Sequence, residues 1–175
     1  MESFPPDSVE TYKALARKWA ATVTVVTVRR APEHVAAGAA ELDGFTATAF
    51  LTVSMAPPII LVSATTAASA FTMLRDAAGF AVNLLAPDHA ELAGAFSKPA
   101  VERVGIWDRI PWTADAAGVP LLGGTTGAFS ARVRQLIDAG DHTLVLGDVT
   151  ALHHGEGAET LVYHNRGYGK IVRHG

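Results

Sequence analysis

Strand patterns without any helical pattern occupy the C-terminal part of the chain, and this limits the folds open to it. Strands are predicted at residues 129–137, 143–152, 160–164 and 168–172. The first two alternate apolar and polar side chains on either side of the turn Ala139–His142, which predicts a β-hairpin. A parallel sheet would need a crossover helix between successive strands. The pattern therefore favours an antiparallel sheet.

Upstream of this region, strand patterns are separated by a few short helical ones. Strands are predicted at residues 22–29, 45–53, 59–62 and 80–85, and helices at residues 9–19, 67–78 and 88–96. A tight turn is expected at Asp43-Gly44, and Gly79 suits the end of the second helix. Residues 31–41 fit either a short strand or a loop. The predicted fold class is mostly β, a closed or partly closed antiparallel Greek-key barrel with short helices.

The chain is expected to form a single domain over residues 1–175, with a helix inside residues 1–20 packing on the barrel. Asp7 or Ser8 is expected to cap that helix, with Glu10 at capping-box spacing from Asp7, and Asp88 with Glu91 repeats this spacing. Residues 97–124 hold three prolines and no clear periodicity. A stretch this long is more often a functional loop or lid than a plain connection.

Composition excludes several classes of protein. The chain has 175 residues, 49% of them apolar and 18% charged, which is a globular composition. The absence of Cys excludes disulfides, thiol catalysis and Cys-ligated metals. With a net charge of −3 and scattered basic residues, nothing indicates nucleic-acid binding. No signal peptide or membrane-spanning stretch is recognisable, so a cytoplasmic protein is expected.

The common nucleotide, metal and hydrolase motifs are missing as well. No glycines fall in GxGxxG or Walker A spacing, and no GxSxG elbow is present. His153 and His154 are adjacent, so they point to opposite faces of a strand, and no HExxH spacing occurs. No metal site is predicted.

The stretch from Gly44 to Ala64 is the main candidate for a binding site. Its strands carry small hydroxyl residues, and the turn at residues 63–69 leads from a strand into a helix. The first turn of a helix offers unpaired N–H groups to a phosphate. The alternatives are an ordinary Ala- and Thr-rich hairpin and hydroxyls that only cap the helix. His142 lies in a predicted turn, where it is either solvated or at the mouth of a pocket.

Taken together, these motifs resemble the flavin reductase family with an FMN-binding split barrel, the short-chain reductase partners of two-component flavin monooxygenases. The matching segments are VTVVT (residues 23–27), DGFTATAFLTVSMAPPIILVS (43–63), the helix at Ser69, GFAVNLL (79–85), AFS (95–97), the region from Trp112 to Gly118-Val119-Pro120, AGDHTLVLGDV (139–149) and LVYHNRGYGKI (161–171). The resemblance covers nearly the whole chain in order.

The resemblance implies a homodimer that uses NAD(P)H to reduce FMN or FAD and releases reduced flavin to a partner monooxygenase. It places His142 beside the nicotinamide, where we expect it to position the ring and not to act as a required acid. The residues that it implies for flavin or nucleotide binding are Thr46, Ala47, Thr48, Ala49, Ser63, Ala64, Thr65, Ser69, Phe96, Ser97, Lys98, Arg166 and Tyr168. Arg166 and Tyr168 are expected close to the pocket that contains His142.

Some residues depart from the family pattern. Thr48 stands where many members have Asn, and Ser63 where many have Cys. Residues 31–41 look longer than usual, and residues 103–105 lack an aromatic side chain.

The alternatives to a flavin reductase are a non-catalytic flavin- or haem-binding barrel, an FMN-dependent oxidase of the pyridoxamine-phosphate type, and a purely structural barrel that dimerises. The choices between NADH and NADPH and between FMN and FAD stay open.

Overall fold

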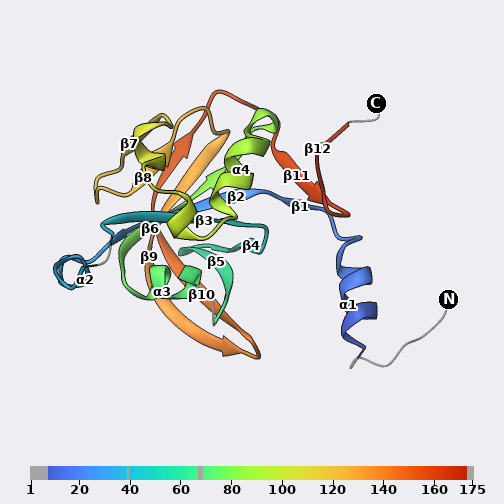
Figure 1. Ribbon diagram of the computed structural model, residues 1–175, viewed down its shortest axis with the longest axis horizontal. Helices are drawn as coiled ribbons and strands as arrows, with labels where there is room; N and C mark the ends of the chain where they lie inside the picture. The colour runs from blue at the N-terminus through green and yellow to red at the C-terminus, as the bar shows by residue number, and fades with distance from the viewer. Residues whose placement is uncertain (1–7, 39, 67–68, 173–175) are drawn as a thin grey trace.

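The computed structural model describes residues 8–38, 40–66 and 69–172, and strands dominate it (Figure 1). The helices are α1 (Val9–Ala16), α2 (Pro32–Ala36), α3 (Ser69–Arg75) and α4 (Ala90–Phe96). The strands are β1 (Ala21–Thr22), β2 (Thr24–Arg30), β3 (Leu42–Ala47), β4 (Phe50–Met55), β5 (Pro58–Thr65), β6 (Ala77–Leu84), β7 (Trp112–Ala114), β8 (Pro120–Leu122), β9 (Gly127–Ala139), β10 (His142–His154), β11 (Leu161–His164) and β12 (Gly167–Lys170). The mostly β prediction is confirmed.

Seven strands form one sheet in the order β3-β2-β6-β9-β10-β5-β4, and every pair in it is antiparallel. The two edge strands, β3 and β4, are consecutive in sequence and are joined only by Thr48 and Ala49. Three peptide steps span at most about 11 Å. The sheet therefore has to curl until its edges meet, which gives the predicted, partly closed barrel.

Strand β2 lies at the centre of the packing because both of its faces are buried. Val26 and Val28 face the barrel interior, while Val23, just before the strand, and Val25 face a second apolar cluster. The β-branched run predicted as a strand thus fills two cores, since successive side chains of a strand point to opposite faces.

Part of residues 97–124 packs into the second apolar cluster. Ile106 and Leu122 are buried there, and Trp107 and Trp112 pack against it. The Trp112 indole N–H donates to the Trp107 carbonyl oxygen over 3.1 Å. Short 3₁₀ turns and the β7–β8 hairpin replace the long regular elements that the prolines prevent. Part of this region thus completes a core, and the expectation of a functional loop stays a prediction for its exposed residues.

Helix α1 does not pack on the barrel of its own chain, contrary to the prediction. Its apolar face is exposed, with Val9 60%, Tyr12 71% and Leu15 69% accessible. The main-chain N–H of Asn165 donates to the Arg17 carbonyl oxygen over 2.9 Å, which links the end of the helix to the β11–β12 turn. Figure 1 shows the helix beside this small C-terminal sheet and away from the barrel.

Two glycine-based predictions are wrong because strand pairing overrides local preference. Asp43 and Gly44 lie inside β3, paired with Val28 and Thr27, and form no turn. Helix α3 ends at Arg75, so Gly79 lies within β6 instead of ending a helix. Residues 67 and 68, where this helix was predicted to begin, lie outside the described residues.

The helix ends also differ from the predictions. Ser8 makes no capping hydrogen bond to the backbone; its hydroxyl contacts the Thr11 hydroxyl at 2.7 Å. Asp7, the other predicted cap, lies outside the described residues. The box expected from Asp88 is absent because a 3₁₀ turn, Pro87–His89, precedes α4. Within the undecided residues 31–41, residues 32–36 form α2.

Candidate functional site

The connector between β3 and β4 forms one wall of the candidate site. Thr48 and Ala49 are exposed, whereas Ala47 is only 8% exposed and has only its backbone to offer a ligand. The main-chain N–H of Ser63 donates to the Ala49 carbonyl oxygen over 3.0 Å and fixes the connector to β5. Ser63 is half-buried beside it. The fold thus brings together predicted residues from two separate segments.

His142 lies at the far end of β5, opposite Thr65 in the β5–β10 register. Its Nδ1 is 2.7 Å from Asp141 Oδ1, and its Nε2 is 3.3 Å from Thr65 Oγ1. The hydrogen bond from His142 lowers the pKa of the Asp141 carboxyl below its ordinary value. In the tautomer that donates Nδ1–H to Asp141, Nε2 accepts from the Thr65 hydroxyl. These two contacts hold the imidazole at the rim of the sheet, and the side chain is still 43% exposed.

Helix α4 is attached to the same wall through Thr46. The Thr46 hydroxyl donates to the Ala93 carbonyl oxygen over 2.6 Å, so the structure uses this hydroxyl to hold the helix. Ser97 and Lys98 follow the helix and are exposed. Phe96 is only 1% exposed, in the second core, and its ring has almost no surface for a cofactor. Its role in cofactor binding stays a prediction.

The predicted residues of the C-terminal hairpin are not near His142. In Figure 1 the β11–β12 hairpin and the turn between β9 and β10 lie at separate parts of the molecule. Tyr168 packs against Tyr163, with ring centroids 5.4 Å apart, and burial followed by the neighbouring phenol raises the pKa of Tyr168. Tyr163 in turn lines a hollow of about 440 Å³ together with Thr48 and Ala49. Within a single chain, Tyr168 therefore contacts Tyr163, and Tyr163 lies beside the β3–β4 connector.

The remaining predicted residues lie where the strands end. Ala64 is only 4% exposed and lies in the barrel core, so it offers only backbone. Ser69 is the exposed first residue of α3, a helix of seven residues. Arg166 lies in the β11–β12 turn with φ of 66°. The role of each in binding stays a prediction.

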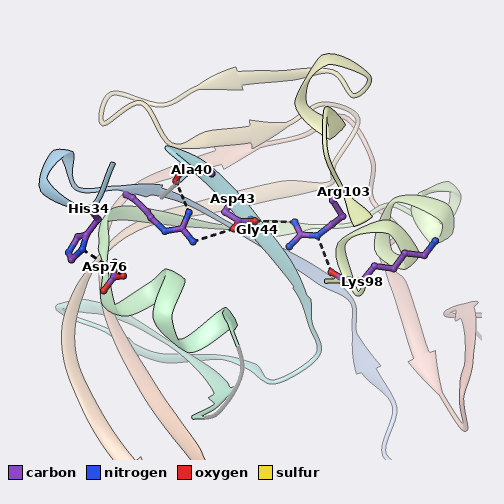
Figure 2. Close-up of polar contacts among 8 residues, drawn as sticks. His34, Ala40, Asp43, Gly44, Asp76, Lys98 and Arg103 are labelled. Carbon is purple, nitrogen blue, oxygen red and sulfur yellow. Dashed lines mark hydrogen bonds and ion pairs between the residues drawn. The ribbon is translucent and has the colours of Figure 1, made fainter. Parts of the chain in front are cut away.

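Sequence reasoning missed a buried group of charges behind the connector (Figure 2). Asp43 accepts from Arg30 Nη2 at 3.2 Å and from Arg103 Nη1 at 3.1 Å. All three residues are less than 10% exposed. Only the charge of Asp43, inside a segment of apolar and small residues, signalled it, and the turn preference of Asp-Gly concealed that signal.

One Ser–His–carboxylate contact among the described residues has the wrong geometry for a hydrolytic triad. Ser130, His153 and Asp115 meet, but the Ser130 hydroxyl donates directly to Asp115 over 2.6 Å and lies 3.0 Å from His153 Nε2. In a hydrolytic triad the carboxylate holds the histidine, and Ser130 is only 1% exposed. Within the described ranges, no cluster of three or more His, Cys, Asp or Glu is placed to hold a metal.

No helix among the residues that the structure describes has the length and apolar character to cross a membrane.

The donors and acceptors of the site suit a flat ring with a polar edge. The Thr48 and Thr65 side chains are exposed, Ser63 is half-buried between them, and small Ala49 leaves the wall open. A flavin ring needs hydroxyl and backbone groups of this kind along its edge, so the residues present fit it. Bound flavin supplies hydride-transfer chemistry, which side chains alone do not provide.

Comparison with known proteins points to the same chemistry. A family described as "Flavin reductase like domain" matches residues 16–172. A relative named NADH:FMN oxidoreductase from Rhodococcus qingshengii is 35% identical over 161 residues, which cover 90% of this chain and 79% of the relative.

Two solved structures share the fold and are more than 25% identical to this chain in sequence. One is BorF, the flavin reductase component of a bacterial two-component tryptophan halogenase, with 27% identity and a TM-score of 0.81 over 94% of this chain and 99% of the other. The other is the flavin reductase HpaC complexed with NADP⁺, with 29% identity and a TM-score of 0.79 over 93% and 97%. With the family match over most of its length, this chain belongs to the flavin reductase-like domain family.

Proposed function

We propose that Thr48, Ala49, Ser63 and Thr65 bind the flavin and that His142 positions the nicotinamide of NAD(P)H. The protein is a NAD(P)H:flavin oxidoreductase that uses FMN or FAD and serves flavin-dependent monooxygenases. The observation that carries the assignment of residues is the arc from the β3–β4 connector, through the end of β5, to His142 on β10.

The protein's own groups have two tasks in this reaction. Hydroxyls and backbone groups along the arc hold the ring edge, and neutral donors there stabilise negative charge that develops on a reduced ring. Asp141 fixes His142 through Nδ1, so the imidazole presents a fixed face to a second ring. No acid is required for hydride transfer between the rings, so His142 acts by orientation.

We further propose that two copies of the chain associate. Besides α1, the exposed edge strand β4 carries Leu51 at 61%, Val53 at 52% and Met55 at 95% accessibility. Exposed apolar surface of this kind marks interaction sites in proteins that otherwise bury such side chains. A second copy would also cover Trp19, which is 78% exposed just after α1. Sedimentation equilibrium of the protein against Leu51→Glu tests this: a monomeric wild type contradicts it.

The direct test of the function is oxidation of NADH and NADPH by the purified protein, followed by nicotinamide absorbance, with and without added FMN and FAD. Turnover that depends on added flavin is expected, and the most active pair identifies donor and acceptor. A yellow protein that oxidises neither nucleotide would instead indicate a flavin binder or an oxidase of another substrate.

A further inference from the structure

Arg103 joins the Ser97–Lys98 segment, which the family resemblance assigns to the cofactor, to the strand that leads into the proposed flavin-binding connector. Its Nε donates to the Lys98 carbonyl oxygen over 3.0 Å, and its Nη1 donates to Asp43 Oδ1 over 3.1 Å (Figure 2). Lys98 follows α4, and Asp43 lies in β3 shortly before the connector that carries Thr48. One guanidinium therefore bridges residues more than fifty positions apart in sequence.

This contact lies in the protein interior, where it is held in one geometry. The Arg103 side chain is 5% accessible and that of Asp43 is 10% accessible. The guanidinium carbon lies 5.4 Å from the centre of the Phe96 ring, in a cation–π position. The planar fork of arginine reaches a carboxylate and a carbonyl at once, which a lysine ammonium does not do with the same geometry.

Asp43 is also held from its other side, and this gives an internal comparison. Arg30 Nη2 lies 3.2 Å from Asp43 Oδ2, while its Nη1 donates to the Ala40 carbonyl oxygen over 2.6 Å. Arg30 thus pairs with the same carboxylate and is equally buried, but it holds the backbone that leads into β3 and makes none of the contacts to α4. Of the two arginines that the structure describes beside Asp43, Arg103 is the one that connects this carboxylate to the Ser97–Lys98 segment.

We infer that Arg103 is a positioning residue for the flavin: it fixes the Ser97–Lys98 segment against β3 and so sets the affinity for the cofactor. Thr46, which holds the Ala93 carbonyl, secures the same helix one turn earlier. The inference rests on the proposed function and on the prediction, from the family resemblance, that Ser97 and Lys98 bind the flavin. It assigns to Arg103 no contact with the flavin itself.

The test compares Arg103→Lys with the matched control Arg30→Lys in the full-length protein. Each keeps a positive charge beside Asp43, and only the first loses the fork to Lys98. For Arg103→Lys, we expect the KM for flavin and the flavin Kd to rise about tenfold, the effect of about 1.4 kcal/mol of binding. The kcat at saturating flavin and the KM for NADH should stay near wild type. Arg30→Lys should lower the melting temperature but change flavin affinity by less than about twofold.

Equal effects of the two variants on flavin affinity, or no effect of either, would show a purely structural ion pair and overturn the inference. Hydrogen exchange on the wild type gives a second readout that does not depend on a variant folding. Added FMN or FAD should slow exchange in peptides that cover residues 97–103, and unchanged exchange there would also overturn it. Loss of the proposed function would appear separately, as a wild type that reduces no flavin.

Discussion

Replacement of Gly44 by Ala tests how closely β3 and α4 are packed behind the site. A Cβ at this position would lie 2.9 Å from the Val26 carbonyl oxygen and 3.1 Å from Phe96 Cε1. The first atom is backbone of a paired strand, and the second belongs to a ring that is 1% exposed. Neither can move by rotation of a flexible side chain. Overpacking of this kind costs about 1–3 kcal/mol.

In a protein of this length, 1 kcal/mol corresponds to about 2–4 °C in Tm. We therefore expect Gly44→Ala to lower the Tm by about 2–12 °C in differential scanning calorimetry. Gly94→Ala is the matched control, because a Cβ there meets nothing within 4 Å. It lies inside α4, where Ala is favoured over Gly by about 0.5–1 kcal/mol, so its Tm should rise.

A double-mutant cycle identifies the neighbour that causes the clash. Phe96→Leu removes ring atoms from the position that the new methyl group would occupy, so it should cost less stability in the Gly44→Ala background than in the wild type. Non-additivity of about 0.5 kcal/mol or more is expected for residues in contact. A Gly44→Ala protein as stable as the wild type would refute the packing argument, and strict additivity would refute the part assigned to Phe96.

Three further outcomes are expected. His142→Ala should raise the KM for NAD(P)H about tenfold with less than about twofold change in flavin Kd, and equal changes in steady-state and titration experiments would exclude a nicotinamide-positioning role. Asn83→Ala should cost about 2 kcal/mol or more in urea unfolding, because Asn83 is fully buried and accepts from the Leu122 N–H, which would lose its partner; an unchanged midpoint would contradict this. The hydrogen bond from Arg75 lowers the pKa of Asp76 from 3.8, so the ionised carboxylate stabilises the fold above that pH. Asp76→Asn should therefore be less stable than wild type at neutral pH, the difference shrinking as the pH falls below 3.8, and a pH-independent difference in denaturation midpoint would refute the ion pair.

Several features of the candidate site could be predicted from the sequence, because they depend on local residue patterns and on the order of segments along the chain. The β9–β10 hairpin is where the alternation predicts it, although His142, expected in the turn, is the first residue of β10. Hydroxyl residues at the end of β5 were recognisable by type alone. That Thr65 lies opposite His142 follows from sheet register, which the sequence does not state.

Predictions from single residue types failed where long-range pairing opposed them. Asp43-Gly44 has the composition of a turn, but the ladder to β2 holds it extended, and Phe96 occupies the space that a side chain would need. Within one chain, Arg166 and Tyr168, which the family resemblance places near His142, lie in the β11–β12 hairpin of a separate small sheet, and their role in binding stays a prediction. Their place depends on which sheet the C-terminal strands join, and alternation cannot indicate that.

The amino-acid sequence by itself determined the strand-rich class, the order of the strands along the chain and the residue types available for binding. Those features follow from side-chain periodicity and backbone preference within a few residues. Only the tertiary structure decided that β3 and β4 meet as the two edges of one sheet and that Arg103 lies between Asp43 and Lys98. Such contacts join segments that are distant in sequence. They are stabilised by packing and charge pairing in a shared interior, and local sequence patterns cannot predict which segments will meet there.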